Sequence, residues 1–470
     1  MEEDKYGLSH EEEIKQVVQR FERMKKNNEN YFFDVIEFES IIDYYLESNN
    51  QVNASEAATI AAKQHPNSVS IQLRKARVLL EKGRAVETLK ILRKLESIEP
   101  GNHEIYIAKG TALGMLGDVT GARKMFDFAL TLDSEDLPNI LFSITSILQN
   151  LNYYEALIPY LFRLMELEPE YYAHKYDLAY AYEKIEDFEK SINYYIQYLE
   201  EEPYSDSAWY NLGIIYNKSE RYEEALEAYD FSLAVNDQNT FALFNKGNIL
   251  SNLERYSEAI NVYHEFLEIE PDNYEALTYL AECYEKSGES EMARKYYQQS
   301  IDLAPEVADS WFGLGVVALD SGDIDESFIY LRKALRFDDE NPEIWFFLGK
   351  AHYINREIKA ALKCFREALK LDAYFDEIWI ELGKIIIAED LTAKALPYLR
   401  KAHKITGDIP GINYLLAVLS LRAGITSDSY THLASAINND NELFNDFREL
   451  LPGNISNDEI RDLLRKHGLL

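Results

Sequence analysis

The side chains best suited to chemistry are spread thinly along this chain. Cys283 and Cys364 form no Cys-x-x-Cys pair, so by themselves they make neither a disulfide framework nor a four-ligand zinc site. The nine histidines are dispersed rather than clustered. Neither a GxSxG nucleophile elbow nor an HExxH metal helix occurs. We therefore expect no catalytic residue, no metal ligand and no cofactor.

Four local patterns resemble ligand sites but fit better as parts of helices and turns. The Gly-Lys pairs at 349–350 and 383–384 lack the Ser or Thr that a GxxxxGK[ST] phosphate loop requires. The glycine run at 110–117 follows no predicted strand, so it is not a dinucleotide fingerprint. The acidic run at 323–326 falls where a second helix begins, and acids there favour the helix dipole. His352 occupies a core position of a helix.

The elements that must position these side chains follow from an internal repeat. The four tryptophans lie 102, 34 and 34 residues apart, at Trp209, Trp311, Trp345 and Trp379. Spacings of 34, 68 or 69 residues separate the alanines Ala54, Ala122, Ala156, Ala225, Ala259, Ala293, Ala361 and Ala395. The same spacings separate the prolines Pro66, Pro100, Pro169, Pro203, Pro271 and Pro305. Together the alanine and proline registers place one extra residue just before Pro169.

One 34-residue stretch carries a recognisable consensus pattern. Its key residues are Trp209, Leu212, Gly213, Tyr216, Ala225 and Tyr229. This pattern resembles the tetratricopeptide repeat, whose consensus is W-x₂-L-G-x₂-Y, then A-x₃-F, then P. The resemblance implies an all-α fold, a right-handed α/α superhelix of stacked antiparallel helical hairpins.

The register covers most of the chain. Twelve repeats are predicted, at 35–68, 69–102, 103–136, 137–171, 172–205, 206–239, 240–273, 274–307, 308–341, 342–375, 376–409 and 410–443. Residues 1–34 are expected to form an N-terminal capping helix, and residues 444–470 C-terminal capping helices. A capping box at Ser9 and Glu12 predicts the start of the first cap, and one at Ser456 and Glu459 predicts the start of the last.

Within a repeat, the first helix carries apolar residues at positions 4, 7, 8 and 11, which share one face at helical spacing. Position 8 is glycine in the sixth repeat, Gly213. We expect it to face the small residue Ala225 of the second helix, so that small against small sets the closest approach within the hairpin.

Positions 5, 9 and 12 lie roughly opposite that face, yet they are often aromatic or apolar. In the tetratricopeptide family, which this chain resembles, that surface of the first helix lines the concave groove that binds peptides or partner helices. The predicted partner-binding residues are Tyr176, Tyr180, Tyr210, Asn211, Ile214, Asn217, Phe244, Asn245, Asn248, Glu282, Glu285, Phe312, Val316, Phe346, Lys350, Tyr353 and Lys384. The alternative is that these side chains pack against the neighbouring repeat.

Two asparagines 34 residues apart, Asn211 and Asn245, match the ladders with which family members hold an extended backbone. Plain solvation is the alternative. The family's carboxylate clamp for chaperone C-termini is absent, because Phe244 and Asn248 are followed by Tyr279 where the clamp requires asparagine.

Charge bounds the choice of partner. The chain has 82 acidic and 48 basic side chains, a formal net charge of −34, which argues against nucleic acid. Residues 151–350 hold 41 of the acids and only 15 bases. Acids on the predicted groove face are Glu183, Glu275, Glu282, Glu285, Asp309 and Asp320, and the face becomes basic at Lys350 and Lys384. These charges predict a partner segment with basic and apolar residues.

No secretory signal is visible in residues 1–10, and no apolar run approaches the roughly 18 residues of a spanning helix. We therefore expect a cytoplasmic protein without a membrane span. The function predicted is a non-enzymatic scaffold or adaptor that binds partner protein segments in its groove. The alternatives are a peptide-responsive regulatory sensor, an assembly subunit that homodimerises through terminal repeats, and an accessory to a separately encoded enzyme.

Overall fold

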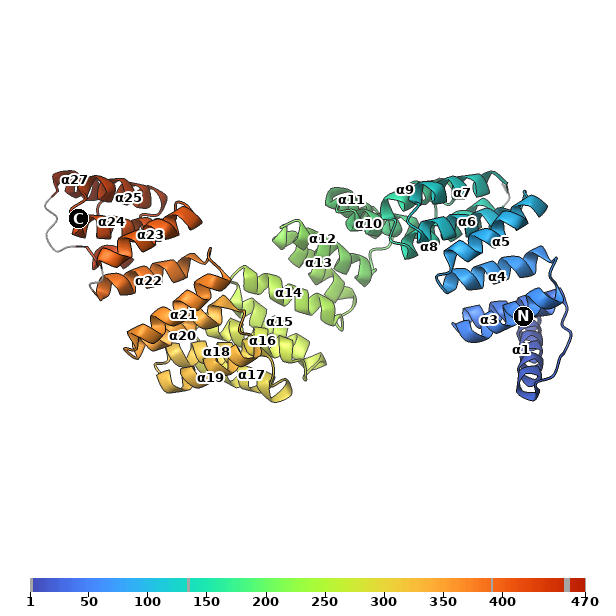
Figure 1. Cartoon of the computed structure of the whole chain (residues 1–470), viewed down its shortest axis with the longest axis horizontal. Helices are drawn as coiled ribbons and strands as arrows, with labels where there is room; N and C mark the ends of the chain where they lie inside the picture. The colour runs from blue at the N-terminus through green and yellow to red at the C-terminus, as the bar shows by residue number, and fades with distance from the viewer. Residues whose placement is uncertain (1–2, 133–135, 390–391, 452–456, 470) are drawn as a thin grey trace. The chain divides into compact units, whose positions relative to one another are not determined.

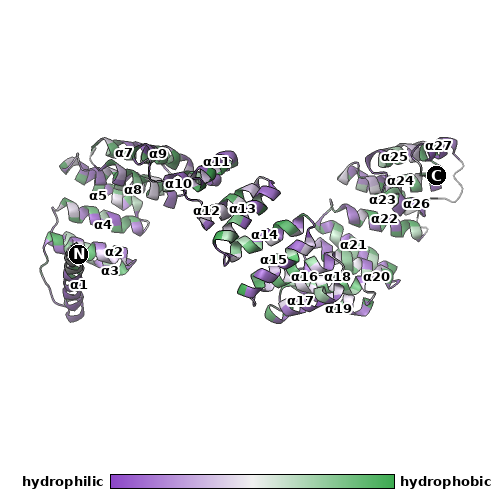
Figure 2. Ribbon diagram, turned by 180° about the vertical axis from the view of Figure 1, so that it is seen from behind, coloured by the Kyte–Doolittle hydropathy of each residue, from purple (hydrophilic) through white to green (hydrophobic). Residues whose placement is uncertain are grey.

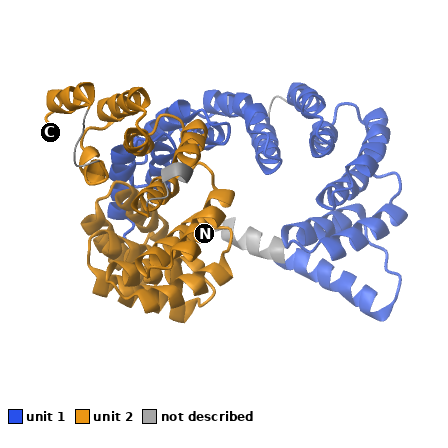
Figure 3. Ribbon diagram, turned by 60° about the vertical axis from the view of Figure 1, so that its left-hand side comes forward, with its two compact units in different colours: residues 1–237 blue, residues 238–470 orange. Residues whose placement is uncertain are grey.

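All regular structure in the described residues is helical. The computed structural model describes residues 3–132, 136–389, 392–451 and 457–469, and these contain 27 helices. The chain divides into two compact units, residues 1–237 and residues 238–470 (Figure 3). The all-helical fold class expected from the repeat is confirmed.

Compact unit 1 consists of one helix followed by six hairpins (Figure 1). Its helices are α1 (Glu3–Asn27), α2 (Val35–Glu47), α3 (Gln51–Gln64), α4 (Val69–Glu81), α5 (Ala85–Ile98), α6 (His103–Met115), α7 (Val119–Leu132), α8 (Leu137–Asn150), α9 (Tyr154–Leu167), α10 (Ala173–Lys184), α11 (Phe188–Leu199), α12 (Asp206–Lys218) and α13 (Tyr222–Val235). The hairpins run from α2 with α3 to α12 with α13, and each even-numbered helix is the first helix of its hairpin.

Compact unit 2 consists of six hairpins followed by two short helices. Its helices are α14 (Thr240–Asn252), α15 (Tyr256–Ile269), α16 (Tyr274–Lys286), α17 (Ser290–Leu303), α18 (Ala308–Asp320), α19 (Ile324–Phe337), α20 (Pro342–Ile354), α21 (Ile358–Leu371), α22 (Asp376–Ala388), α23 (Thr392–Thr406), α24 (Pro410–Arg422), α25 (Thr426–Asn439), α26 (Phe444–Arg448) and α27 (Asp458–Lys466).

Packing within each unit is between neighbours along the chain. The two helices of a hairpin pack against each other, and the second packs against the first helix of the next hairpin. Hydrophobic and hydrophilic residues alternate along the helices (Figure 2), as expected where one side is buried in a stack. The unit-by-unit division into 34-residue repeats stays a prediction.

Helix starts and turns follow from local chemistry. Many first helices are capped by a side-chain oxygen that accepts a backbone N–H of the first turn, from Ser68, Asn102, Ser205, Asn239, Asn273 and Asn341. The turn inside a hairpin needs a left-handed residue. Gly288 adopts it at φ 83°, whereas Glu220, at φ 59°, bears a side chain that opposes this conformation.

The regular spacing of these turns along the chain shows that the extra residue lies elsewhere than predicted. Gly117 and Asn152, both left-handed, are 35 residues apart, whereas Asn152 and Glu186 are 34 apart. The insertion therefore lies before Asn152, and the placement just before Pro169 is wrong. Measured from the turn, Leu157 rather than Ala156 corresponds to Ala122, because both lie five residues after the left-handed residue.

The glycine of the first helix packs against an aromatic ring, not against the small residue expected. A Cβ added to Gly213 would lie 2.6 Å from Cε1 of Tyr229, and one added to Gly247 would lie 2.8 Å from Cε1 of Tyr263. Both tyrosines are fully buried. Glycine is needed there because the ring of the second helix occupies the space of a side chain, so the predicted contact of Gly213 with Ala225 is corrected.

Buried hydroxyls fill gaps in the alanine register. Thr88, Ser191, Ser327 and Ser429 stand where other repeats have alanine, and all four are buried. Each donates to the backbone carbonyl of the residue twelve positions earlier, at 2.7–3.4 Å. A small residue is thus required at this position, and a hydroxyl is tolerated because it finds an acceptor.

The two predicted cap starts differ from the structure. Helix α1 begins at Glu3, so Ser9 lies inside the helix and does not cap it. Ser456 lies outside the described residues; the N-cap of α27 is Asn457, whose side chain accepts from the N–H of Ile460.

Candidate partner-binding face

Seventeen predicted site residues lie on first helices of both compact units. We call this surface the first-helix face and describe it separately for each unit. The side chain of Asn217 is exposed, those of Val316 and Phe346 are buried, and the other fourteen are intermediate. Most of these side chains therefore pack in part against a neighbouring helix and present the remaining surface to solvent.

In compact unit 1 aromatic residues pack within the hairpin of α10 and α11, and a hydrogen bond links them to the next hairpin. The ring of Tyr176 lies 5.4 Å from those of both Tyr195 and Tyr198, edge to face. Asn211 Nδ2 donates to the Tyr176 hydroxyl at 2.7 Å, across 35 residues of sequence. The side-chain amide of Asn211, one of the two asparagines of the predicted ladder, therefore already forms a hydrogen bond within the protein. Tyr180 lies under the ammonium of Lys184, at 4.6 Å from the ring centroid.

In compact unit 2 an aromatic cluster begins at α14. The ring of Phe244 lies 5.6 Å from Phe266 and 5.7 Å from Tyr279. Tyr279 stacks on Tyr263 and keeps 41% of its surface exposed. The Tyr263 hydroxyl donates to Asn248 Oδ1 at 2.6 Å, which leaves the Asn248 amide nitrogen as the group able to donate outward.

Two predicted contact residues are core residues instead. Val316 is 6% exposed and Phe346 is 7% exposed. The Phe346 ring meets Phe347, Phe365 and Phe375 at 5.4–5.9 Å. Rings of its own hairpin and Phe375, just before α22, thus cover Phe346, and neither Phe346 nor Val316 presents much surface to a partner.

Acidic side chains line the face on α16 and α18. Burial raises the pKa of Glu282, and the carboxylates of Asp309 and Glu343 raise it further while Lys286 lowers it. Burial also raises the pKa of Glu285, although the Tyr297 hydroxyl, donating at 2.9 Å, acts the other way. Burial likewise raises the pKa of Asp309. Burial and, for Glu282 and Glu285, the neighbouring carboxylates therefore destabilise the charged forms of these side chains.

Sequence reasoning missed part of a carboxylate row at the N-terminal ends of four first helices. Glu275, Asp309, Glu343 and Glu377 follow one another at intervals of 34 residues and are all exposed. Among the described residues none of the four forms an ion pair with a basic side chain. We call them the carboxylate row. A search at position 2 of each repeat would have found them.

Basic side chains of the face are engaged by aromatic and acidic neighbours. Lys350 Nζ lies 5.0 Å from the ring centroid of Phe347. Lys384 Nζ contacts Glu381 Oε1 at 3.1 Å and lies 5.3 Å from the centroid of Phe447. The face therefore changes from acidic near α16 and α18 to partly basic at α20 and α22.

The dispersed chemical groups have structural partners. Burial raises the pKa of both the Cys283 and the Cys364 thiol to about 11, so neither is a thiolate near neutral pH. His352 Nδ1 pairs with Glu357 at 2.6 Å. Asp323 and Glu326 both bind Arg294, at 3.0 and 3.1 Å. Within the described ranges no group of three or more His, Cys, Asp or Glu is arranged to hold a metal ion.

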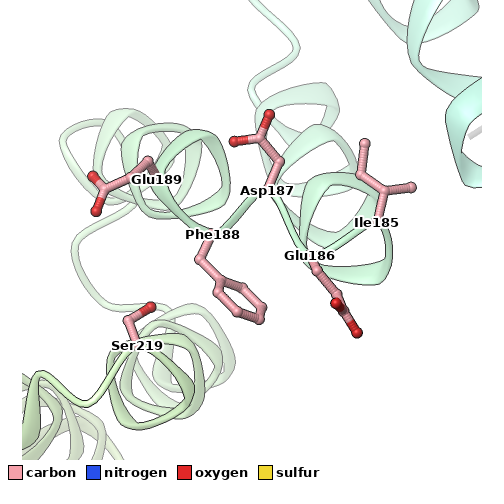
Figure 4. Close-up of a pocket in the computed structure, with 6 residues that line it drawn as sticks. All are labelled: Ile185, Glu186, Asp187, Phe188, Glu189 and Ser219. Carbon is pink, nitrogen blue, oxygen red and sulfur yellow. The ribbon is translucent and has the colours of Figure 1, made fainter.

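A shallow pocket in compact unit 1, at the turns that follow α10 and α12, includes none of the predicted site residues. It is lined by Ile185, Glu186, Asp187, Phe188, Glu189 and Ser219. Figure 4 shows that the carboxylates of Asp187 and Glu189 point away from the Phe188 ring. Asp187 caps α11 and forms an ion pair with Lys190, so its carboxylate has partners within the protein. No catalytic arrangement is present among these six residues.

Several solved structures are similar to this chain. YrrB, a tetratricopeptide repeat protein with an unusual peptide-binding site, is 18% identical, covering 39% of this chain and 95% of its own, with a TM-score of 0.33. MamA from Desulfovibrio magneticus RS-1 is 18% identical, covering 36% and 95%, with a TM-score of 0.34. The Cut9–Hcn1 hetero-tetramer of the APC/C is 14% identical, covering 87% and 94%, with a TM-score of 0.43. No curated protein matches this chain.

Family models confirm what the residue pattern indicates. Models described as tetratricopeptide repeat match residues 175–204, 207–239, 253–311, 284–342 and 342–374. No helix in the described part of the chain combines the length and apolar character of a membrane span. The described residues form twelve helical hairpins, and tetratricopeptide models match five stretches between residues 175 and 374, so the chain is a tetratricopeptide repeat protein.

Proposed function

We propose that this protein is a non-enzymatic cytoplasmic scaffold that binds segments of partner proteins on the first-helix face of compact unit 2. The segment carries basic and apolar residues. The observation that carries the proposal is that carboxylates lie beside the exposed ring of Tyr279. Burial raises the pKa of Tyr279, and the carboxylates of Glu275 and Asp309, from the carboxylate row, and of Glu282 raise it further. Charge and aromatic surface therefore lie together.

The carboxylate row has one internal role, which is too small to account for the whole arrangement. Each acid sits in the first turn of its helix, where the dipole stabilises it by about 0.3–1 kcal/mol. Stabilisation by the helix dipole does not explain Glu282, because this residue lies in the third turn of α16, where it is partly buried beside other carboxylates. A cationic segment would relieve this repulsion, and the aromatic surface would bury its apolar side chains.

Binding of a defined cationic probe tests the proposal. The probe is a labelled synthetic peptide that alternates lysine with leucine and phenylalanine, and its anisotropy is followed during titration with the full chain. The triple variant Glu275→Lys, Asp309→Lys, Glu343→Lys should weaken binding at least about tenfold, because it reverses the local field.

The matched control carries the same change in net charge on second helices. Glu291→Lys, Asp302→Lys and Asp325→Lys alter exposed acids of compact unit 2 that lie off the first-helix face. Their affinity should fall much less. Equal losses in both triple variants would mean that the probe responds only to net charge, and the assignment of this face would be abandoned.

A further inference from the structure

The short helix α26 covers the C-terminal end of the first-helix face. The ring of Phe447 stacks on Tyr414 of α24 at 5.2 Å and lies 5.3 Å from Lys384 Nζ of α22. A Cβ on Gly411 would lie 3.6 Å from Cζ of Phe447 and 2.6 Å from Cδ1 of Ile380. The segment therefore sits on two first helices at once, beside α22 and α24 (Figure 2).

This placement differs from that of a further repeat. Elsewhere in compact unit 2 a first helix packs mainly on the second helix of the hairpin just before it, as α24 does on α23, whereas α26 packs on α24, a first helix. Through Phe447, α26 reaches α22, which is two hairpins back. Lys384 belongs to the predicted partner-binding residues, and Tyr414 occupies the equivalent position 5 of the last repeat. The segment thus occupies the place expected for a ligand.

The segment is also held by polar contacts. Arg422, near the end of α24, donates through Nη2 to the carbonyl of Leu450 at 2.8 Å and through Nη1 to that of Ile387 at 3.4 Å. Phe444 and Phe447 are 2% and 1% exposed. Residues 441–451 carry three acids and one base, Arg448, and the covered face contributes Lys384 and Arg422. Aromatic burial and opposite charge therefore both favour this contact.

We propose that residues 441–451 are an intramolecular occupant of the first-helix face, and that a partner segment of the same chemistry displaces them. That chemistry is two aromatic side chains three residues apart within an acidic stretch. It is recognised by Tyr414, Lys384 and Arg422 on α22 and α24, apart from the carboxylates of Glu275, Asp309 and Glu343 to which the cationic segment of the proposed function would bind. The inference rests on the proposed function and names a regulation of the same face. A tethered segment competes at an effective concentration in the millimolar range, so an external segment binds well only when α26 is released.

A peptide competition measures this release. The probe is a labelled peptide of residues 439–451, titrated with the full chain. The variant Phe444→Ala, Phe447→Ala should bind it at least about tenfold more tightly than the unaltered chain does, because the internal competitor is weakened. A peptide in which both phenylalanines are alanine should bind neither protein. The control variant Phe128→Ala, Phe162→Ala, altered in compact unit 1, should behave like the unaltered chain.

Hydrogen exchange of the unaltered chain keeps the proposal testable if that variant does not fold. Amides of 444–451 should exchange at least about 100-fold faster than those of α24, because the segment opens without unfolding its neighbour. Equal protection in the two segments, or a folded variant with no gain in peptide binding, would overturn the inference. The cationic probe described above would still bind in that case, so failure here and failure of the proposed function are distinguishable.

Discussion

At the scale of single residues, the close approach of helix and ring gives the sharpest prediction. Gly213→Ala gains up to about 1 kcal/mol of helix propensity but places a methyl group 2.6 Å from the Tyr229 ring. Overpacking of this kind costs about 1–3 kcal/mol, so the net effect should be a loss of about 1 kcal/mol. Urea unfolding followed by circular dichroism measures it.

Gly101→Ala is the control for that substitution. An added Cβ there meets nothing within 4 Å, and the residue is exposed. Its free energy of unfolding should stay within about 0.5 kcal/mol of the unaltered protein. A loss as large as that of Gly213→Ala would show that the ring contact is not the cause.

The charged form of Glu282 should lower the stability of the folded protein while it strengthens binding of the cationic probe. Its pKa is raised in the folded state, first by burial, so the folded protein binds more protons than the unfolded chain between the two pKa values. The stability contributed by this group therefore falls as pH rises through that window. Glu282→Gln should stabilise the protein by about 0.5–1 kcal/mol at neutral pH and bring no gain near pH 4.

The same variant should bind the cationic probe less tightly at neutral pH, since it removes a charge from the face. Thermal unfolding across pH and probe titration measure the two effects. If Glu282→Gln lost stability at neutral pH, the carboxylate would be serving an internal contact, and its place in the partner-binding face would be wrong.

What the sequence revealed of these residues was their helix face, not their exposure. Their spacing places positions 5, 9 and 12 on one side of the first helix, but Val316 and Phe346 are buried there. The burial of Phe346 depends in part on Phe375, which precedes α22 of the next hairpin, and such a contact cannot be read from spacing within one repeat. The pairing of Asn211 with Tyr176 has the same origin, because it joins residues of successive hairpins.

At the scale of helices, an indole clip joins each of several hairpins to the segment before it. The Nε1 of Trp209, Trp311, Trp345 and Trp379 donates to the carbonyl six residues earlier, at 2.9–3.0 Å. Trp311→Phe keeps an aromatic ring but loses this donor and some volume. It should lower stability by about 1–3 kcal/mol, measured by urea unfolding.

Tyr330→Phe is the matched control, because Tyr330 stacks on Trp311 and the substitution removes only a hydroxyl. Its cost should stay below about 0.5 kcal/mol. A cost for Trp311→Phe no larger than this would mean that the clip contributes nothing to the junction.

Helix order was predictable because the 34-residue register repeats in several residue types at once. Local details were not. The extra residue before Asn152 was placed too late in the sequence, because Ala156 lies 34 residues after Ala122 and so hides the insertion, whereas the left-handed turns mark the true spacing. The start of α1 at Glu3 was missed because a capping pattern also occurs inside helices.

At the scale of the whole molecule, charge should govern stability. The formal net charge is −34, and much of it lies in residues 151–350, where acids outnumber bases by 41 to 15. Raising NaCl from about 20 to about 300 mM shortens the screening length and weakens this repulsion. The urea midpoint should therefore rise.

A control for the salt effect is the same titration near pH 4, where protonation already removes much of the negative charge. The rise should then be smaller. A midpoint that falls with NaCl at neutral pH would show that attractive ion pairs outweigh the repulsion. The fold class was predictable at this scale, whereas the exact repeat boundaries stay a prediction.

Contacts confined to neighbours along the chain have a consequence for biosynthesis. The strong helix pairings in each compact unit join helices no more than two positions apart in the order of elements. A nascent chain can therefore bury the apolar side of one hairpin as soon as the next has left the ribosome. At about 5–20 residues per second, a 34-residue hairpin waits roughly 2 to 7 seconds for its neighbour. Only the newest hairpin then needs protection by a chaperone at any moment.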